Sequence, residues 1–194
     1  MISYKKLSKD DINSLPLIKY QGDIQVLSDE NHIEEAIEYL LTQKVIGFDT
    51  ETRPTFTKGT LNAPSIIQLA GDDIVFIFQL DSNKIFKKLS QILSDIAITK
   101  CGVSVDRDLI ELMYLSPFNP CSFIDLGDIA RMRGIPHHGL RGLAALLLNH
   151  RISKSSQTSD WSRKTLSHNQ INYAATDAWI SLELFKKFDQ ESII

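Results

Sequence analysis

The order of apolar and polar residues along the chain predicts short strands that alternate with amphipathic helices. Runs rich in Val, Ile, Leu and Phe indicate buried strands at residues 24–27, 45–49, 65–70, 74–78, 97–100 and 122–125. A Gly-Asp-Asp sequence at residues 71–73 separates two of these runs and is typical of a hairpin turn. We therefore expect the second, third and fourth runs to form a mostly antiparallel core sheet.

Helices are expected where apolar residues recur every three or four positions. This pattern predicts helices near residues 33–41, 83–93, 105–115, 126–132 and 139–148, and a long helix after Ser167. Residues 8–13 resemble a short capped helix, Asp125 and Ser167 are well placed as caps, and Ser28 or Asp29 should cap the helix from residue 33. Because no repeat or linker is visible, we interpret residues 1–23 as an N-terminal extension packed on a domain of residues 24–194.

Composition narrows the class of protein. The 194 residues are 43% hydrophobic and 23% charged, as in one soluble domain with a substantial core. No apolar run is long enough to span a membrane, the N-terminus lacks the features of a signal peptide, and Cys101 and Cys121 fit reduced thiols. We therefore expect a cytoplasmic protein. The net charge of −3 argues against a strong overall basic field, but not against a local one.

Asp49 and Glu51, at the end of the predicted strand 45–49, are the strongest chemical signal in the chain. They lie two residues apart, so they share one side of the strand. Their repulsion and desolvation disfavour ionisation of both carboxylates. A bound divalent cation removes this cost, and carboxylate oxygens suit Mg²⁺ or Mn²⁺. The pair therefore predicts a metal-dependent enzyme.

Two later segments strengthen this prediction. Residues 100–109 read as a strand, a glycine turn and the start of a helix that carries Asp106 and Asp108. Tyr173 and Asp177 lie four residues apart on the long helix and share one face. Asp177 has mostly apolar or small neighbours, which is a poor setting for a simple solvated charge.

These segments resemble the DEDDy branch of DnaQ-type 3′–5′ exonuclease domains. The matching residues are 48–54, 65–69, 102–108, 140–143, 159–161 and 173–177. The order and spacing are most similar to the Werner-syndrome-type exonuclease domain and also similar to ribonuclease D. The sister DEDDh branch carries a histidine five residues before the last aspartate, where this chain has Asn172.

The resemblance implies an α/β fold, a ribonuclease H-like mixed β-sheet with helices on both faces. It implies four metal-binding catalytic acids and a tyrosine that orients the attacking water: Asp49, Glu51, Asp108, Asp177 and Tyr173. Two divalent metal ions, Mg²⁺ or Mn²⁺, would support hydrolysis of nucleic acid from its 3′ end, with release of nucleoside 5′-monophosphates. The family pattern favours Asp108 over Asp106 as the ligand, and we interpret Asp106 as a helix cap or a supporting group.

The loop after the first acidic pair is expected at the mouth of the site. Arg53 and Lys58 are candidate phosphate contacts, and Phe56 is a candidate for stacking on a base. Weaker basic candidates stand elsewhere: Arg107, Arg141, Lys154, Arg163 and Lys164. His137 and His138 look like a metal pair, but without a third ligand at useful spacing we expect only a turn there.

The resemblance leaves the substrate open between DNA and RNA. DNA is favoured because the chain lacks the additional C-terminal helical domain usual in ribonuclease D-like enzymes, and RNA 3′-end processing is the alternative. A catalytically silent nucleic-acid-binding module is a second alternative, and a metal phosphatase acting on mononucleotides is a third. Retention of all four acids and Tyr173 argues against the silent module. A separately encoded helicase is a candidate partner, and the oligomeric state is left open.

Overall fold

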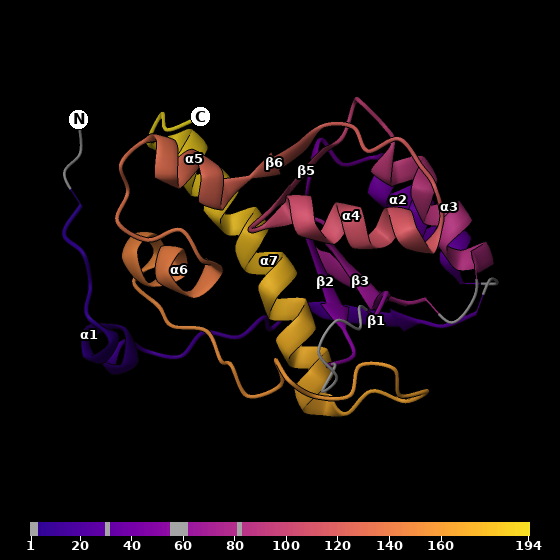
Figure 1. Cartoon of the computed structure of the whole chain (residues 1–194), viewed down its shortest axis with the longest axis horizontal. Coiled ribbons are helices and arrows are strands. Elements are labelled where there is room, and N and C mark those ends of the chain that lie inside the picture. Colours follow the sequence, from indigo (N-terminus) through magenta and orange to yellow (C-terminus); the bar gives the residue numbers. More distant parts are fainter. Residues whose placement is uncertain (1–3, 30–31, 55–61, 81–82) are drawn as a thin grey trace.

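Figure 1 shows a computed structural model that describes residues 4–29, 32–54, 62–80 and 83–194. One mixed sheet has the strand order β1-β4-β3-β2-β5-β6. The strands are β1 (Asp23–Leu27), β2 (Val45–Thr52), β3 (Pro64–Ala70), β4 (Ile74–Gln79), β5 (Thr99–Gly102) and β6 (Phe123–Asp125). As predicted, β2, β3 and β4 are antiparallel neighbours, and the outer strands join them in parallel pairs.

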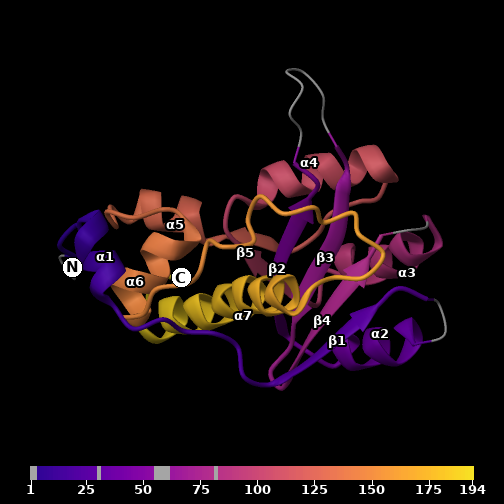
Figure 2. The same ribbon diagram turned by 90° about the horizontal axis from the view of Figure 1, so that it is seen from below.

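Helices cover both faces of this sheet, which confirms the predicted α/β architecture. They are α1 (Lys9–Ser14), α2 (Ile33–Leu41), α3 (Asn83–Leu93), α4 (Val105–Leu115), α5 (Leu126–Met132), α6 (Leu140–Leu148) and α7 (His168–Gln190). Alternate residues of β3 face opposite layers, because Ile67 packs in the core with α2, α3 and α4, whereas Ile66 packs against α7. Figure 2 shows α1, α5 and α6 gathered on one side of the molecule, with α2 and α3 on the other.

Three of the predicted helix caps form. Side-chain oxygens accept backbone N–H groups of the first helical turn at Ser8, Asp125 and Ser167. The prediction for α2 was wrong, because its N-cap is His32 and not Ser28 or Asp29, and no side chain caps it. The imidazole of His32 lies 3.3 Å from Asp29, so that aspartate engages the ring at the helix start instead of capping it.

Helix α7 crosses the sheet at Gly47 of β2. A Cβ atom at this position would lie 2.0 Å from the carbonyl oxygen of Ala178, which only a glycine avoids. The crossing brings Asp177, the residue before Ala178, beside β2. The strand also extends to Thr52, because its pairing with β3 continues past residue 49. The first two acids therefore lie within a strand and not at its end. Within the described residues, no helix is both long and apolar enough to cross a bilayer.

Candidate active site

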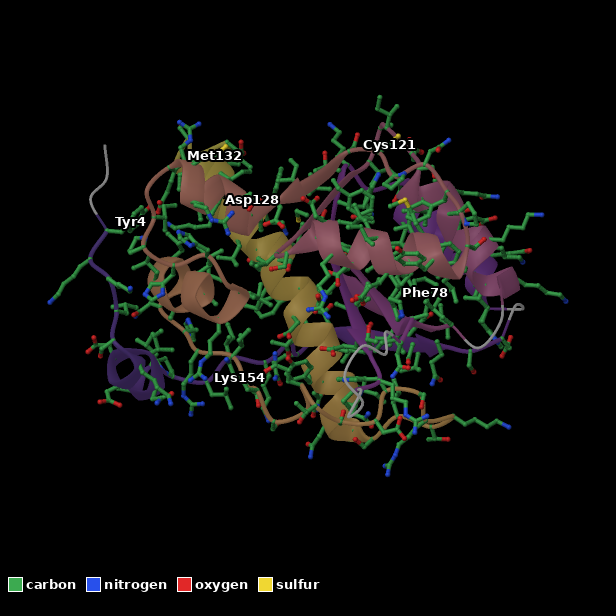
Figure 3. The ribbon with its side chains drawn as sticks, in the orientation of Figure 1. Tyr4, Phe78, Cys121, Asp128, Met132 and Lys154 are labelled. Carbon is green, nitrogen blue, oxygen red and sulfur yellow. The ribbon has the colours of Figure 1, made fainter. Side chains whose placement is uncertain are left out.

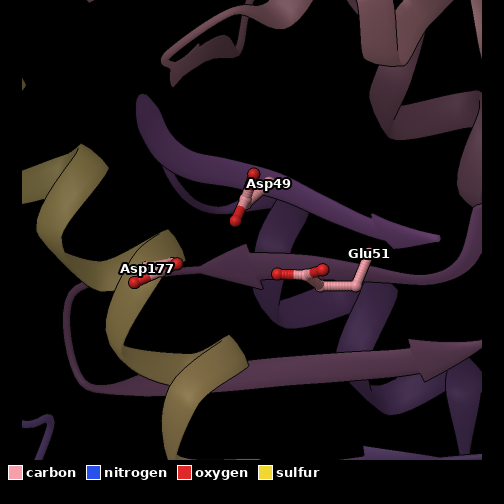
Figure 4. Close-up of side chains that lie close together, drawn as sticks. All are labelled: Asp49, Glu51 and Asp177. Atoms are coloured by element: carbon pink, nitrogen blue, oxygen red, sulfur yellow. The ribbon is translucent and has the colours of Figure 1, made fainter. Parts of the chain in front are cut away.

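Three carboxylates converge where α7 crosses β2. Oxygen atoms of Asp49, Glu51 and Asp177 all lie within 4.8 Å of one another (Figure 4). Asp49 and Glu51 share one side of β2 because strand residues alternate, and α7 supplies Asp177 from the opposite wall. Two segments more than a hundred residues apart in sequence therefore build one oxygen-rich group.

Asp108 joins this group from the first turn of α4. The Thr50 hydroxyl donates a 2.9 Å hydrogen bond to Asp108 Oδ1, which holds the carboxyl group against β2. The charge of Asp108 contributes to the raised pKa values of both Asp49 and Glu51, so its carboxylate belongs to the same electrostatic cluster. Asp106 is exposed on the same helix and does not line the cleft around the acids. Asp108, and not Asp106, thus lies in the cleft with the other three acids, outside the group of three whose oxygens lie within 4.8 Å of one another, and its role as a metal ligand stays a prediction.

Tyr173 lies one helical turn before Asp177 and faces the same cleft. Its ring is buried and packs against the fully buried Trp161, with 5.9 Å between ring centroids. Burial first, and then the nearby carboxylates of Asp177, Glu51 and Asp49, raise the pKa of Tyr173 above its ordinary value of 10.0. The phenol therefore stays protonated at neutral pH, and it can donate or accept a hydrogen bond but cannot act as a base.

The four acids cannot all be ionised easily without a cation. Burial, followed by the charges of Asp177 and Asp108, raises the pKa of Glu51 from 4.5 to about 9. Burial is also the main reason why the pKa values of Asp108 and Asp177 both rise from 3.8 to about 7. Burial and three neighbouring carboxylates likewise raise the pKa of Asp49 well above its ordinary value. Because hard oxygen donors gathered under such repulsion suit Mg²⁺ or Mn²⁺, this donor set fits divalent metal ions.

The acids and Tyr173 line a cleft of about 890 Å³. Other parts of its wall carry basic side chains: Lys9, Arg107, Arg141, Lys154 and His137. Three of these, Arg107, Arg141 and Lys154, were weak candidates from the sequence. Sequence reasoning missed Lys9 and His137 as cleft residues. Lys9 reaches the cleft through the packing of the N-terminal segment, and His137 lies just before α6, where its Nε2 accepts a hydrogen bond from the backbone N–H of Leu7.

The predicted phosphate-binding loop contributes less than expected within the described residues. Arg53 is exposed, lies 3.8 Å from the carboxylate of Asp160, and does not line the cleft. Phe56 and Lys58 fall outside the described residues, so their predicted roles stay predictions. Arg163 and Lys164 are exposed and also do not line the cleft.

Comparisons with known proteins agree with this arrangement. The sequence model of a 3′–5′ exonuclease family matches residues 24–193. The mouse bifunctional 3′–5′ exonuclease/ATP-dependent helicase WRN is 29% identical over 185 residues, which is 90% of this chain and 13% of that protein. Ribonuclease D of Gluconacetobacter diazotrophicus is 30% identical over 145 residues, which is 73% of this chain and 36% of that enzyme.

A solved structure extends the agreement to the fold. The exonuclease domain of Nibbler from Aedes aegypti has a TM-score of 0.77 and 22% sequence identity, and the match covers 98% of this chain and 92% of that domain. This likeness confirms the ribonuclease H-like fold.

Fold and carboxylate cluster together define a hydrolase with a candidate metal centre. The chain belongs to the 3′–5′ exonuclease family, as the match over residues 24–193 shows. It spans only a small to moderate part of the curated relatives just described.

Proposed function

We propose that the chain hydrolyses phosphodiester bonds of nucleic acid from the 3′ end and releases nucleoside 5′-monophosphates. The carboxylate cluster carries this proposal, because three acids from β2 and α7 lie within 4.8 Å of one another in the cleft of a 3′–5′ exonuclease family member. Such a cluster is suited to a reaction in which negative charge develops on both the attacking and the leaving oxygen.

The proposed roles follow from where each side chain lies. The residues that would hold two divalent ions, Mg²⁺ or Mn²⁺, are Asp49, Glu51, Asp108 and Asp177. When bound, the ions would lower the pKa of the attacking water and stabilise the leaving 3′-oxygen. Tyr173 orients that water by hydrogen bonding, since its raised pKa excludes a role as base. Thr50 keeps Asp108 in place through its 2.9 Å hydrogen bond.

We propose DNA as the preferred substrate. Ribonuclease D, whose name gives RNA as its substrate, matches 73% of this chain, whereas the mouse WRN exonuclease/helicase matches 90%. Coverage alone does not separate the two, because a solved Trypanosoma brucei ribonuclease D in complex with RNA matches 92% of this chain. The match to DNA polymerase I of Aquifex aeolicus, over 85% of this chain, supports the proposed preference for DNA. Processing of RNA 3′ ends is the second candidate, and the ribonuclease D match supports it. A separate helicase partner and a cytoplasmic location also remain predictions.

A degradation assay tests the proposal. Matched oligonucleotides labelled at the 5′ end would be offered as single-stranded DNA, 3′-recessed duplex DNA and RNA, with Mg²⁺, with Mn²⁺ and with EDTA. We expect a metal-dependent ladder that shortens one nucleotide at a time, and nucleoside 5′-monophosphates as products. The matched control is Asp49→Asn, which should be inactive, beside Asp106→Asn, which should retain activity because Asp106 lies outside the cleft.

Several outcomes would contradict the proposal. Internal cuts would indicate an endonuclease, and release of inorganic phosphate from mononucleotides would indicate a phosphatase. Binding of the oligonucleotides without hydrolysis under any metal condition would indicate a silent binding module. Faster degradation of RNA than of matched DNA would overturn only the DNA preference.

A further inference from the structure

The N-terminal segment supplies part of the cleft wall. Leu7, Lys9 and Ile12 line the same cleft as the four acids, although the exonuclease family match begins only at residue 24. Figures 1 and 2 show α1 beside α6, at the side of the molecule away from α2 and α3. A segment that precedes the residues matched by the family model therefore faces the candidate active site.

Several hydrogen bonds fix this segment on the domain. The backbone N–H of Leu7 donates to Nε2 of His137 at 3.1 Å, just before α6. Nε of Arg151 donates to the carbonyl oxygen of Leu15 at 3.0 Å, and the backbone N–H of Tyr20 donates to the Thr176 hydroxyl of α7 at 3.1 Å. Contacts between Leu7 and Tyr20 hold this part of the segment on the domain, on both sides of Lys9, and so the position of α1 beside the cleft is built into the fold.

Arg141, in the first turn of α6, is held by the same segment. One of its terminal nitrogens donates a short hydrogen bond to the Asn13 side chain. Its Nε atom is buried and has no hydrogen-bond partner, although the side chain lines the cleft. An unpartnered buried donor on a cation is unfavourable, and an anionic oxygen would satisfy it. Arg141 therefore offers a buried donor that an anionic oxygen in the cleft would satisfy.

Three cations on this wall have no carboxylate partner among the described residues. In the described part of the chain, Lys9, Arg141 and Lys154 form no salt bridge, whereas Arg107 across the cleft is paired with Glu111 at 2.9 Å. Figure 3 shows Lys154 on the α6 side of α7, and Figure 1 shows α4 on the other side. The cleft thus has an acidic wall, formed by Asp49, Glu51, Asp108 and Asp177, and a basic wall, formed by Lys9, Arg141 and Lys154.

We propose that Lys9, Arg141 and Lys154 bind backbone phosphates of the nucleotides that precede the scissile bond. This inference rests on the proposed function, which places the scissile phosphate at the acidic wall. A guanidinium group and two ammonium groups are the side chains that recognise phosphate oxygens, and the chain's net charge of −3 provides little long-range attraction of its own. The N-terminal segment is then a substrate-binding element and not only a packed extension.

The test measures binding and hydrolysis separately in the full chain. Fluorescence anisotropy in EDTA would give the affinity of a single-stranded dodecanucleotide for wild type and Lys9→Ala over a range of salt concentrations. Lys9 is exposed, so its truncation should not disturb folding. The matched control is Lys5→Ala, which changes an exposed lysine of the same segment that does not line the cleft.

We expect Lys9→Ala to weaken binding about 2- to 5-fold, as for one exposed charge pair. The slope of log affinity against log salt should become shallower by about 0.7, the value for one phosphate contact on a single strand. Lys9→Ala combined with Lys154→Ala should lose more affinity than either change alone. With metal present, Lys9→Ala should raise KM for the dodecanucleotide with little change in kcat, and it should leave dinucleotide hydrolysis unchanged.

Equal affinity and equal salt slope for Lys9→Ala and wild type would overturn the inference. An equal loss of hydrolysis rate on the dodecanucleotide and the dinucleotide would also overturn it, because such a loss would indicate a structural effect on the acidic wall. Absence of hydrolysis in wild type, with binding that depends on Lys9, would overturn the proposed function and leave the phosphate-binding wall standing. Hydrolysis by wild type, with binding that does not depend on Lys9, would support the proposed function and overturn the phosphate-binding role of this wall.

Discussion

Replacing Asp177 by asparagine is predicted to stabilise the metal-free protein above neutral pH. Asp177 is only 6% exposed, and burial raises its pKa from 3.8 to about 7. At about 1.36 kcal/mol for each tenfold change in proton affinity, its ionised form opposes folding by about 4 kcal/mol at pH 8. Asparagine keeps the shape without the charge, but its amide also needs partners, so we expect a net gain of about 2–3 kcal/mol.

The gain should depend on pH in one direction. The folded protein binds the Asp177 proton more tightly than the unfolded chain does, so the free energy of unfolding falls as pH rises. For this carboxyl group the fall begins near its ordinary pKa of 3.8 and is complete above about 7. Near about pH 4 only the cost of the asparagine amide remains, so Asp177→Asn should be less stable than wild type by about 1–2 kcal/mol, and the full net gain should be seen near about pH 8.

Urea denaturation in EDTA at these two pH values measures the difference. For a chain of this size, each kcal/mol also corresponds to a rise in Tm of about 2–4 °C. Adding Mn²⁺ should stabilise wild type at pH 8 and leave Asp177→Asn nearly unchanged, because a bound ion stabilises only the state that holds it. The control is Asp106→Asn, an exposed position outside the cleft. A less stable Asp177→Asn at pH 8 without metal would refute the reasoning, and so would an equal gain in the control.

Three further changes test other parts of the site. Tyr173→Phe should lower kcat by about 10²–10⁴-fold in the degradation assay and keep Mn²⁺ affinity, and loss of Mn²⁺ binding would instead assign the phenol to support of the acids. Gly47→Ala should lower the free energy of unfolding, measured by urea denaturation, by about 1–3 kcal/mol or more and should weaken Mn²⁺ binding, because a Cβ atom there would lie 2.0 Å from the Ala178 carbonyl oxygen. Unchanged stability would show that α7 approaches β2 less closely. Replacing Arg53 and Lys58 together by alanine should flatten the salt slope of binding by about 0.7 for each phosphate that these side chains bind, and an unchanged slope would exclude this loop from the substrate path.

The sequence was sufficient to predict most of the elements, because each carries its own local signal. The helix α3 begins and ends at the predicted residues, and Ser167 caps α7 as its sequence indicates. Strand ends were less predictable. Strand β5 covers Thr99–Gly102, two residues beyond the predicted run at 97–100, because pairing with β2 and β6 selects the register. The extension of β2 to Thr52 likewise depends on its partner β3.

The acidic wall was predictable, whereas the basic wall was not. Alternation on β2 puts Asp49 and Glu51 on one side of the strand, the four-residue spacing on α7 puts Tyr173 and Asp177 on one face, and the family resemblance joins them in one site. Lys9 offers no such pattern, since its side chain reaches the cleft only because distant segments hold α1 against α6. Contacts between segments more than a hundred residues apart, such as Leu7 with His137, leave no periodic trace in the sequence.

Anomalous diffraction from crystals grown with Mn²⁺ tests the central claim most directly. The proposed site predicts two manganese peaks about 3.5–4 Å apart, bound by oxygens of Asp49, Glu51, Asp108 and Asp177. Crystals of Asp49→Asn grown in the same way should lose at least one of the two peaks. Manganese peaks only outside this cleft, or none at all at saturating Mn²⁺, would contradict the account.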